Sequence, residues 1–370
     1  MPESCVLFRV DAGPQIGLGH LQRCLSLASA LRQLDATCLF LTNEESNLLD
    51  RVTRFGFSGY RLDAIESWSA EDLAQTISIA GAHGCDAIIV DSDYEGDGYL
   101  DQLRKAGFFV CAIEDMAPHP FPCQLVVNGD AHAHQLAYHS SSGDTLFLLG
   151  PEYSILRAEF WKIGPRVVSD GVENILVTFG GADQCNLTPR ALGLLNQLPG
   201  NLSVTTIIGP FFNNIEEIED SVARAERPVR LVYSPDEVGD LMLQADLAIS
   251  AGGQTLYELA CAGCPTVAVR MAANQDGQLG VFEESGFIRI AGHGDDDGVV
   301  QAIGDAIRTL LPDADARATM SAAGQRLIDG QGALRVARAI LGAINTHKRS
   351  SQAVKLSIAD QIDGDTRRFH

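Results

Sequence analysis

Three glycine-rich turns carry the side chains that could bind an anion or move a proton. The first follows an expected strand and reads DAGPQIGLGHLQR, so Gly17 and Gly19 precede His20 at the expected start of a helix. Glycine lets a backbone approach a ligand closely, and a helix start offers unpaired amides to an anion. An imidazole at that point faces the ligand and titrates near neutral pH. Read together with Asp11 and Arg23, His20 is therefore a candidate for chemistry.

The other two turns lie in the second half of the chain. The GGAD segment contributes Gly180 and Gly181, which we expect to face the first turn across a crevice. The segment SAGGQTLYELACAGCPTVAV predicts a strand, a turn and a helix whose N-terminus could bind phosphate, with ligand residues Gly252, Gly253, Gln254, Thr255 and Glu258. Glu258 is either a solvated helix charge or the acceptor for two ribose hydroxyls. Its position between Leu256 and Leu259 on an apolar helix favours the ribose.

The elements that must position these turns alternate between strand and helix. Short apolar runs at 6–10, 37–41, 87–90, 108–113, 125–127 and 146–149 are interleaved with helical patterns near 21–34, 71–82 and 99–105. A second series of strands is expected at 174–178, 204–208, 230–232, 247–250, 266–269 and 288–290. The alternation predicts an α/β protein with two facing, doubly wound Rossmann-like domains and a ligand cleft between them. No third glycine completes a GxGxxG fingerprint after the first strand, so NAD and FAD are not expected.

Breaks in this pattern predict the domain limits. We expect an N-terminal domain at 1–150, a linker at 151–171, and a C-terminal domain at 172–345 whose last helices lie near 299–311, 316–329 and 333–345. Residues 346–370 are polar and lack a period, so they are expected to be disordered.

Charge and composition argue against several classes of partner. The 370 residues include 27 basic and 48 acidic side chains, a formal net charge of −21, and 46% of the residues are hydrophobic. No basic face is available for nucleic acid or for an anionic membrane, and no apolar run approaches the roughly 18 residues that span a bilayer. The first residues lack the pattern of a signal peptide, so we expect a cytoplasmic protein, for which a monomer is a possible state.

The nine cysteines predict free thiols, because their number is odd and they are scattered over expected strands and helices. Cys261 and Cys264 have CxxC spacing, but a helix that ends at Gly263 explains that spacing better than a redox or zinc site does.

Several motifs, occurring in order, resemble those of nucleotide-sugar enzymes with the GT-B fold, the group that contains the lipid II-forming N-acetylglucosaminyltransferase MurG. They read FRVDAGPQIGLGHLQRCL, IIVDSDYEGDGYLDQLR, AIEDMA, LVVNGDAHAH, LGPEYSILRAEF, VTFGGAD, and SAGGQTLYE followed by NQ. More closely, residues 6 to about 287 resemble the UDP-sugar hydrolase family of pseudaminic acid biosynthesis (PseG) and its spore-coat polysaccharide relatives (SpsG). The resemblance implies that water releases UDP from a UDP-linked 2,4-diacetamido-2,4,6-trideoxyhexose and leaves the free sugar.

The resemblance also implies roles for particular residues. In that family the histidine of the GxGH turn is the general base that activates water, which corresponds to His20, and a histidine suits that task near neutral pH. The amides of the second-half turn and the Thr255 hydroxyl would hold the diphosphate, Glu258 the ribose, and the backbone near Tyr233 the uracil. Sugar contacts are implied for Tyr94, Asn128, Asn274 and Gln275. No cofactor and no metal are implied.

The sequence departs from the family pattern at DSDYEG. Many relatives have an Asp, one further residue and then a Tyr, whereas here Asp91, Ser92 and Asp93 precede Tyr94. The extra residue shifts the tyrosine and suggests that Asp91 or Asp93 helps to orient His20 or the water. Asp11 is expected to be a turn or orienting residue rather than a base.

Three other functions remain open. A glycosyltransferase with a UDP-sugar donor and a soluble hydroxyl acceptor would use the same fold; a membrane-bound acceptor is disfavoured, because residues 1–165 carry 10 basic and 22 acidic side chains. A non-catalytic nucleotide-sugar-binding protein is disfavoured by His20 in the expected turn. A hydrolysing 2-epimerase usually carries several catalytic carboxylates and histidines that we cannot place. The expected partners are a small-molecule UDP-sugar and water.

Overall fold

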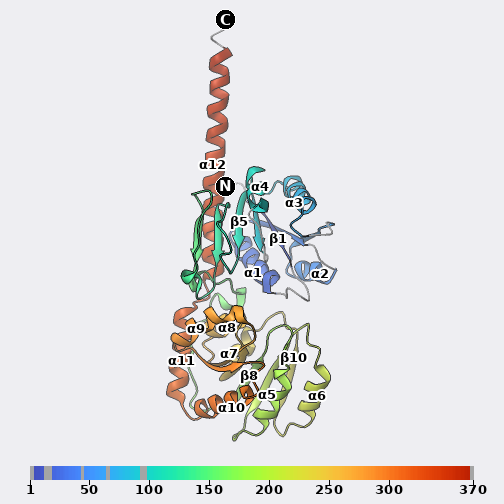
Figure 1. Cartoon of the computed structure of the whole chain (residues 1–370), viewed down its shortest axis with the longest axis vertical. Helices are drawn as coiled ribbons and strands as arrows, with labels where there is room; N and C mark the ends of the chain where they lie inside the picture. The colour runs from blue at the N-terminus through green and yellow to red at the C-terminus, as the bar shows by residue number, and fades with distance from the viewer. Residues whose placement is uncertain (1–3, 12–18, 43–45, 64–66, 92–97, 367–370) are drawn as a thin grey trace.

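The computed structural model describes residues 4–11, 19–42, 46–63, 67–91 and 98–366, which form two α/β domains, one above the other in Figure 1. The N-terminal sheet has the order β3-β2-β1-β4-β5-β6-β7, and each neighbouring pair is parallel. Its strands are β1 (Cys5–Val10), β2 (Thr37–Thr42), β3 (Ser58–Arg61), β4 (Ala87–Asp91), β5 (Phe109–Ile113), β6 (Leu125–Asn128) and β7 (Leu146–Leu149). The central strands are nearly continuous apolar runs, as expected where helices cover both faces of a parallel sheet.

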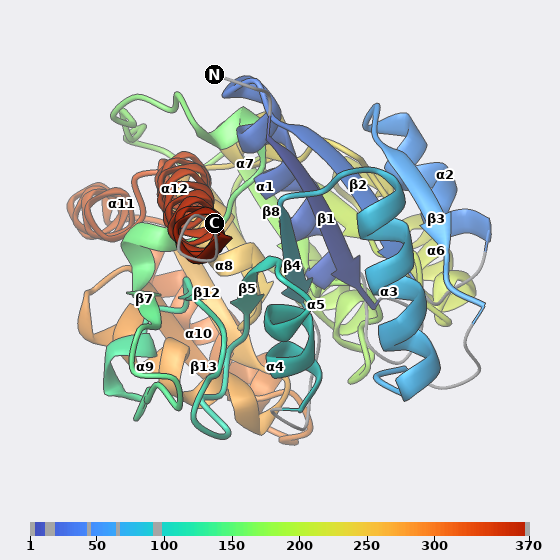
Figure 2. The same cartoon turned by 90° about the horizontal axis from the view of Figure 1, so that it is seen from above.

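Alternate residues of β1 enter two separate cores. Val6, Phe8 and Val10 pack in the core that includes α1 (Gly19–Gln33), α2 (Ser46–Arg54) and the C-terminal helix α12 (Gly332–Thr366). Leu7 packs in the opposite core, with α3 (Ala70–Ala82) and α4 (Gly98–Lys105). Figure 2 shows α3 and α4 on one side of β1 and β4, and α1 and α12 on the other.

The C-terminal sheet repeats this plan with the order β10-β9-β8-β11-β12-β13, again with parallel pairs. Its strands are β8 (Asn174–Thr178), β9 (Ser203–Ile208), β10 (Val229–Tyr233), β11 (Leu247–Ala251), β12 (Thr266–Arg270) and β13 (Ile288–His293). The core on one face includes α5 (Leu187–Asn196), α6 (Ile215–Ala223) and α10 (Val299–Leu310). The core on the other includes α7 (Gly239–Gln244), α8 (Thr255–Cys261), α9 (Asp276–Glu284) and α11 (Ala314–Leu327). The predicted α/β class with two doubly wound domains is confirmed.

Both sheets reverse their strand order once, and these two points locate the ligand site. In the first sheet the reversal lies between β1 and β4, and in the second between β8 and β11. In open α/β sheets, ligands bind outside the carboxyl ends of the strands at such switch points. At these strand ends, Asp91 is the last residue of β4, His20 lies in the helix that follows β1, and β8 and β11 lead into the glycine-rich segments near Gly180 and Gly252.

Helix α12 differs from the prediction in two ways. The sequence predicted that residues 333–345 close the C-terminal domain, but Ala333, Ile340 and Ile344 are fully buried in the N-terminal core, and α12 packs against α1. The predicted disorder of 346–370 is also wrong for 346–366, because the helix continues to Thr366 (Figure 1). No proline interrupts the stretch, so nothing stops the helix at Asn345. Within the described ranges, no helix, including this long one, is apolar enough over its length to cross a membrane.

The packing of α12 on the first domain can be tested by Ile340→Ala. Because Ile340 is 0% exposed in the N-terminal core, the substitution removes buried methylene groups and leaves a cavity. We expect the free energy of unfolding to fall by about 2–5 kcal/mol in urea denaturation. Arg338→Ala, on the exposed side of the same helix, is the control and should stay within about 0.5 kcal/mol. Equal effects of the two variants would contradict this packing.

The cysteines behave as the sequence predicted. All nine lie in described segments, and no two of them form a disulfide. α8 ends at Cys261, Gly263 takes a φ of +64°, and Cys264 is buried just before β12. The CxxC spacing is therefore the end of a helix and the start of a strand.

Candidate active site

The candidate site is a pocket of about 540 Å³ between the two domains. Such a volume suits a small-molecule ligand. The N-terminal domain contributes the start of α1 and one side chain of α2, the linker contributes Arg157, and the ends of β8, β9, β11 and β12 with their following turns supply most of the rest. Both switch points therefore open toward one site, as the fold predicts.

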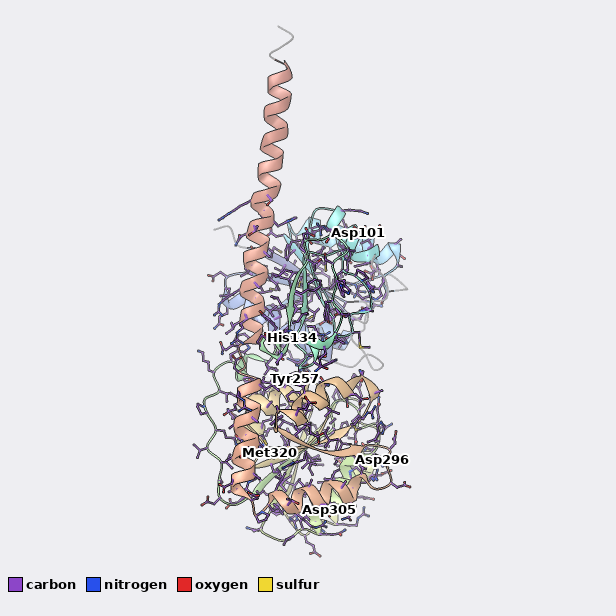
Figure 3. The ribbon with its side chains drawn as sticks, turned by 60° about the vertical axis from the view of Figure 1, so that its left-hand side comes forward. Asp101, His134, Tyr257, Asp296, Asp305 and Met320 are labelled. Carbon is purple, nitrogen blue, oxygen red and sulfur yellow. The ribbon has the colours of Figure 1, made fainter. Side chains whose placement is uncertain are left out.

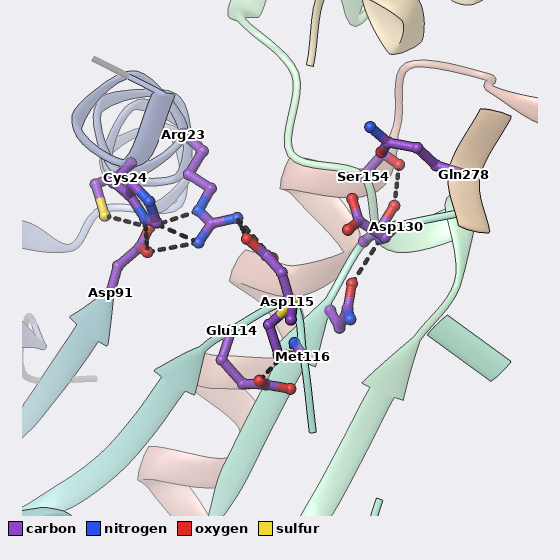
Figure 4. A network of polar contacts seen from close by, with 12 residues as sticks. Arg23, Cys24, Asp91, Glu114, Asp115, Met116, Asp130, Ser154 and Gln278 are labelled. Carbon is purple, nitrogen blue, oxygen red and sulfur yellow. Dashed lines mark hydrogen bonds and ion pairs between the residues drawn. The ribbon is translucent and has the colours of Figure 1, made fainter. Parts of the chain in front are cut away.

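His20 is held by a buried carboxylate beside this pocket. Its Nδ1 lies 2.7 Å from Oδ1 of Asp91, the last residue of β4, and Asp91 is 0% exposed. Arg23, one turn further along α1, donates from Nε and Nη2 to the two Asp91 oxygens at 2.7 and 2.6 Å. Figure 4 shows Arg23 between Asp91 and Asp115, to which it donates a second pair of hydrogen bonds from Nη1 at 2.7 and 2.8 Å. This direct contact between the two side chains supports the hypothesis that Asp91 helps to orient His20.

The contacts of His20 select one tautomer of its ring. Nδ1 lies 2.7 Å from an Asp91 oxygen and 3.1 Å from Nη2 of Arg23, and one nitrogen cannot donate to the first while accepting from the second. The shorter, charge-assisted contact to the carboxylate is the stronger, so Nδ1 carries the proton. The neutral ring then has its lone pair on Nε2, which is the nitrogen able to take a proton from water.

Burial and neighbouring charges shift the pKa values of both Asp91 and His20. Burial raises the pKa of Asp91, but Arg23 and His20 outweigh burial and hold the pKa well below its usual range. Burial lowers the pKa of His20, whereas the charge and hydrogen bond of Asp91 raise it more, so the net shift is upward from 6.5. A general base works best when its pKa lies near the pH at which the enzyme operates. Enough of the group is then unprotonated, and it still has a strong tendency to take a proton.

The structure brings half of the predicted ligand residues together in the pocket lining. These are Gly19, Gly180, Gly181, Gly253, Gln254, Thr255, Glu258, Asn274 and Gln275. His20 is not itself among the lining residues, but its neighbours Gly19 and Gln22 are. Gly180 has a φ of +72°. Residues other than glycine rarely adopt this backbone conformation, so the turn favours a glycine here. The predicted residues Gly17 and Tyr94 lie outside the described residues.

Other predicted ligand residues are occupied within the protein. Asp11 is buried and pairs with Arg9 at 2.5 Å, which suits the orienting role expected for it. Asn128 is fully buried, donates from Nδ2 to the Tyr138 hydroxyl at 2.7 Å and accepts from the Asp130 amide at 2.7 Å. Arg23 and Asp91 hold each other and His20. None of these four residues is among those that line the pocket.

Two further predicted residues, Tyr233 and Gly252, are not among those that line the pocket. The Tyr233 side chain is 53% exposed, and its hydroxyl contacts Glu219 rather than the pocket. The two residues that follow it, Ser234 and Pro235, line the pocket. Gly252 lies just behind the lining, where an added Cβ would come within 2.9 Å of the Gln275 and Leu279 side chains.

Sequence reasoning missed two arginines in the pocket wall. Arg51 of α2 and Arg157 of the linker both line the pocket and are mostly buried, with side-chain exposures of 13% and 19%. Arg157 pairs through Nε with Glu258 at 3.0 Å, and Arg51 lies 3.5 Å from the Asp236 carboxylate. The pKa of Arg51 is lowered by burial and by the nearby charges of Arg157 and Arg54. Two partly buried guanidinium groups that repel each other form a place where an anion is stabilised.

These arginines add a second source of positive charge to the one that the sequence predicted. The sequence analysis placed the anion at the start of the helix after Gly253. That helix, α8, has only seven residues, so few peptide dipoles align in it. The guanidinium groups of Arg51 and Arg157 add formal positive charge to the pocket wall, each beside a carboxylate. Within the described residues, no group of three or more His, Cys, Asp or Glu side chains is placed to hold a metal ion.

Comparison with solved structures defines the class of fold. MurG from Acinetobacter baumannii superposes with a TM-score of 0.67 at 16% identity, covering 92% of this chain and 100% of that one. The UDP complex of MnaA from S. aureus superposes with a TM-score of 0.64 at 14% identity, covering 92% and 97%. The chain has a GT-B-like fold, as its motifs predicted.

Comparison with curated sequences gives the relatives, although no protein-family model matches the chain. An uncharacterized protein of Methanocaldococcus jannaschii is 26% identical over 271 residues, covering 70% of this chain and 54% of that one, so the match spans about half of that relative. The spore coat polysaccharide biosynthesis protein SpsG of Bacillus subtilis is 26% identical over 341 residues, covering 88% and 94%. The UDP-2,4-diacetamido-2,4,6-trideoxy-beta-L-altropyranose hydrolase of Campylobacter jejuni is 22% identical over 285 residues, covering 76% and 97%. The resemblance to these two named kinds of protein is thereby confirmed.

Proposed function

We propose that this protein hydrolyses a UDP-linked 2,4-diacetamido-2,4,6-trideoxyhexose to UDP and the free sugar, in the biosynthesis of a pseudaminic-type nonulosonic acid. The observation that carries the proposal is the imidazole of His20, oriented by buried Asp91, beside a pocket that contains two arginines. The hydrolase from Campylobacter jejuni, which aligns over 97% of its own length, supports the choice of reaction and substrate.

The reaction follows from these groups. Nε2 of His20 takes a proton from water, and the water oxygen forms a bond to the anomeric carbon of the sugar. The bond from that carbon to the phosphate oxygen breaks, and its electron pair leaves with UDP. Arg51 and Arg157 stabilise the charge that develops on the diphosphate, which makes a strong general acid unnecessary. Glu258 is 5% exposed in the pocket wall, where its carboxylate can accept from the ribose hydroxyls.

The test is release of UDP from a panel of UDP-sugars, including the 2,4-diacetamido-2,4,6-trideoxy-altrose donor, in oxygen-18 water with no acceptor. We expect rapid release, with the label on the anomeric oxygen of the sugar. Release that requires an added acceptor would instead support the glycosyltransferase alternative, and tight UDP-sugar binding without turnover would support a binding protein.

The proposed diphosphate contacts predict the effect of Arg51→Gln. A charge-assisted hydrogen bond contributes about 1.5–3 kcal/mol, so we expect calorimetry to show UDP affinity weakened about 10- to 100-fold. Arg54→Gln is a matched control, since Arg54 lies on the same helix and also pairs with Asp236, but is 60% exposed and does not line the pocket. Its affinity should stay within about twofold of wild type. If both variants bind UDP as wild type does, Arg51 does not contact the phosphates.

A further inference from the structure

A chain of hydrogen bonds joins the two domains behind the pocket. Asp130, which follows β6 in the first domain, lies 3.0 Å through Oδ1 from the hydroxyl of Tyr257 on α8 of the second. That hydroxyl lies 2.8 Å from Oε1 of Gln278 on α9, and the Gln278 amide donates from Nε2 to the carbonyl of Gly252. Tyr257 is 1% exposed, and Figure 3 shows it at the level where the two domains meet.

The far end of this chain is the glycine-rich turn of the pocket. Gly253 and Gln254, directly after Gly252, line the pocket wall. Gly252 itself is closely packed, because an added Cβ would lie 2.9 Å from Gln275 and Leu279. A change in what holds the Gly252 carbonyl is therefore expected to move residues that line the pocket.

The protons of this chain of hydrogen bonds can be arranged in two ways, which differ in the group to which Tyr257 donates. The Tyr257 hydroxyl has one proton and two lone pairs, and the Ala131 amide donates to it at 2.9 Å. Gln278 uses its NH₂ group on Gly252, so the oxygen that it turns to Tyr257 can only accept. If Tyr257 donates to Gln278, the contact with Asp130 must be donated by the carboxyl group, which is then protonated. If Asp130 is ionised, it takes the tyrosine proton, and the buried oxygen of Gln278 loses this donor, which is unfavourable.

We propose that Asp130 is a positioning residue that keeps its proton when nucleotide is bound and, through Tyr257 and Gln278, fixes the glycine-rich turn of the pocket. When Asp130 loses that proton, the Tyr257 hydroxyl donates to Asp130 instead of to Gln278. Gln278 is then held less firmly, and so is the Gly252 carbonyl to which it donates. The inference rests on the proposed function only in taking this pocket as the site of a uridine nucleotide.

The charges around Asp130 fit this role. Glu114 and Asp115, at the end of β5, oppose its ionisation, Arg23 from α1 favours it, and Tyr257 from α8 donates to the charged form. From α9 the contact is the uncharged Gln278. Burial is the largest influence and, with the two acidic neighbours, raises the pKa of Asp130 to about 7. The carboxyl is therefore mainly protonated below neutral pH and ionised above it.

The test compares UDP affinity between pH 6.5 and 9 by calorimetry in wild type, Asp130→Asn and Tyr257→Phe. The asparagine amide can donate to Tyr257 as the protonated carboxyl does. We expect wild-type affinity to fall about fivefold relative to Asp130→Asn as the pH rises, with the two within about twofold at pH 6.5. Taking the ratio at each pH cancels the titration of UDP itself. Tyr257→Phe removes the hydroxyl that links Asp130 to Gln278. This variant should bind UDP about fivefold more weakly than Asp130→Asn at every pH.

The failures of the two proposals are distinguishable. If wild type and Asp130→Asn keep a constant affinity ratio from pH 6.5 to 9, Asp130 does not position the turn, whatever the enzyme catalyses. If Asp130→Asn does not fold, Tyr257→Phe still decides, because unchanged affinity and an unchanged pH profile in that variant overturn the inference. Absence of UDP binding by wild type would instead refute the proposed function.

Discussion

His20→Ala is expected to lower kcat for UDP release by a factor of about 10² or more, because general-base catalysis contributes about 10²–10⁴ and alanine cannot accept a proton. The Kd for UDP should stay within about threefold of wild type. The reason is geometric, since Gly19 and Gln22 line the pocket while His20 does not. Single-turnover measurement of UDP release and calorimetry with UDP separate the two effects.

His139→Ala is the matched control for this variant. His139 is exposed on the N-terminal domain and does not line the pocket. We expect wild-type kcat and wild-type UDP affinity. Turnover of His20→Ala at a rate comparable to wild type would remove His20 from the mechanism.

Asp91→Asn is expected to lower kcat by roughly 10²- to 10⁴-fold, the range seen where the carboxylate behind a catalytic histidine is replaced by an amide. The asparagine NH₂ group can donate to Nδ1 of His20, which moves the ring proton to Nε2 and blocks the nitrogen that must accept from water. Asp115→Asn is a matched control, because Asp115 also pairs with Arg23, but its side chain is 33% exposed whereas that of Asp91 is 0% exposed. We expect a loss of less than about tenfold for that variant.

The pH profile of Asp91→Asn tests the same contact independently. In wild type the base must be neutral, so kcat/KM should fall as the pH drops through the His20 pKa, which is raised above 6.5. Without the Asp91 charge, burial and Arg23 both lower that pKa, and the acid limb should move to lower pH. A limb that stays in place while kcat falls would show that Asp91 does not act through the imidazole.

The parts of the structure that sequence patterns predict best are those defined within one element. β4 and β11 are short apolar runs that end at the predicted turns, and the helix from Gly19 begins where the glycine pattern indicates. The contact between Asp91 and His20 could be predicted because Asp91 ends β4 and His20 follows β1. These strands are parallel neighbours in a doubly wound sheet, so both residues lie at the same edge.

The parts that sequence patterns missed depend on what an element packs against. Periodicity shows that residues 333–345 have an apolar face, but not that the face covers the first domain instead of the second. Arg51 lies on a short polar helix, and Arg157 in a linker with little pattern, so each looked like an ordinary surface charge. Only the approach of the two domains places them in one pocket. The side-chain direction of Tyr233 on the edge strand β10 likewise depends on tertiary context.

The return of α12 to the first domain has a consequence for how the chain is made. A ribosome produces the whole N-terminal sheet first, yet the core residues Ala333, Ile340 and Ile344 that complete its covering are translated only after the entire second domain. The first domain therefore waits, with an apolar surface open, while the second is synthesised, although domains generally fold in the order of synthesis. A nascent chain arrested before α12 docks would expose this apolar surface, which is the kind of surface that leads to aggregation and that chaperones bind.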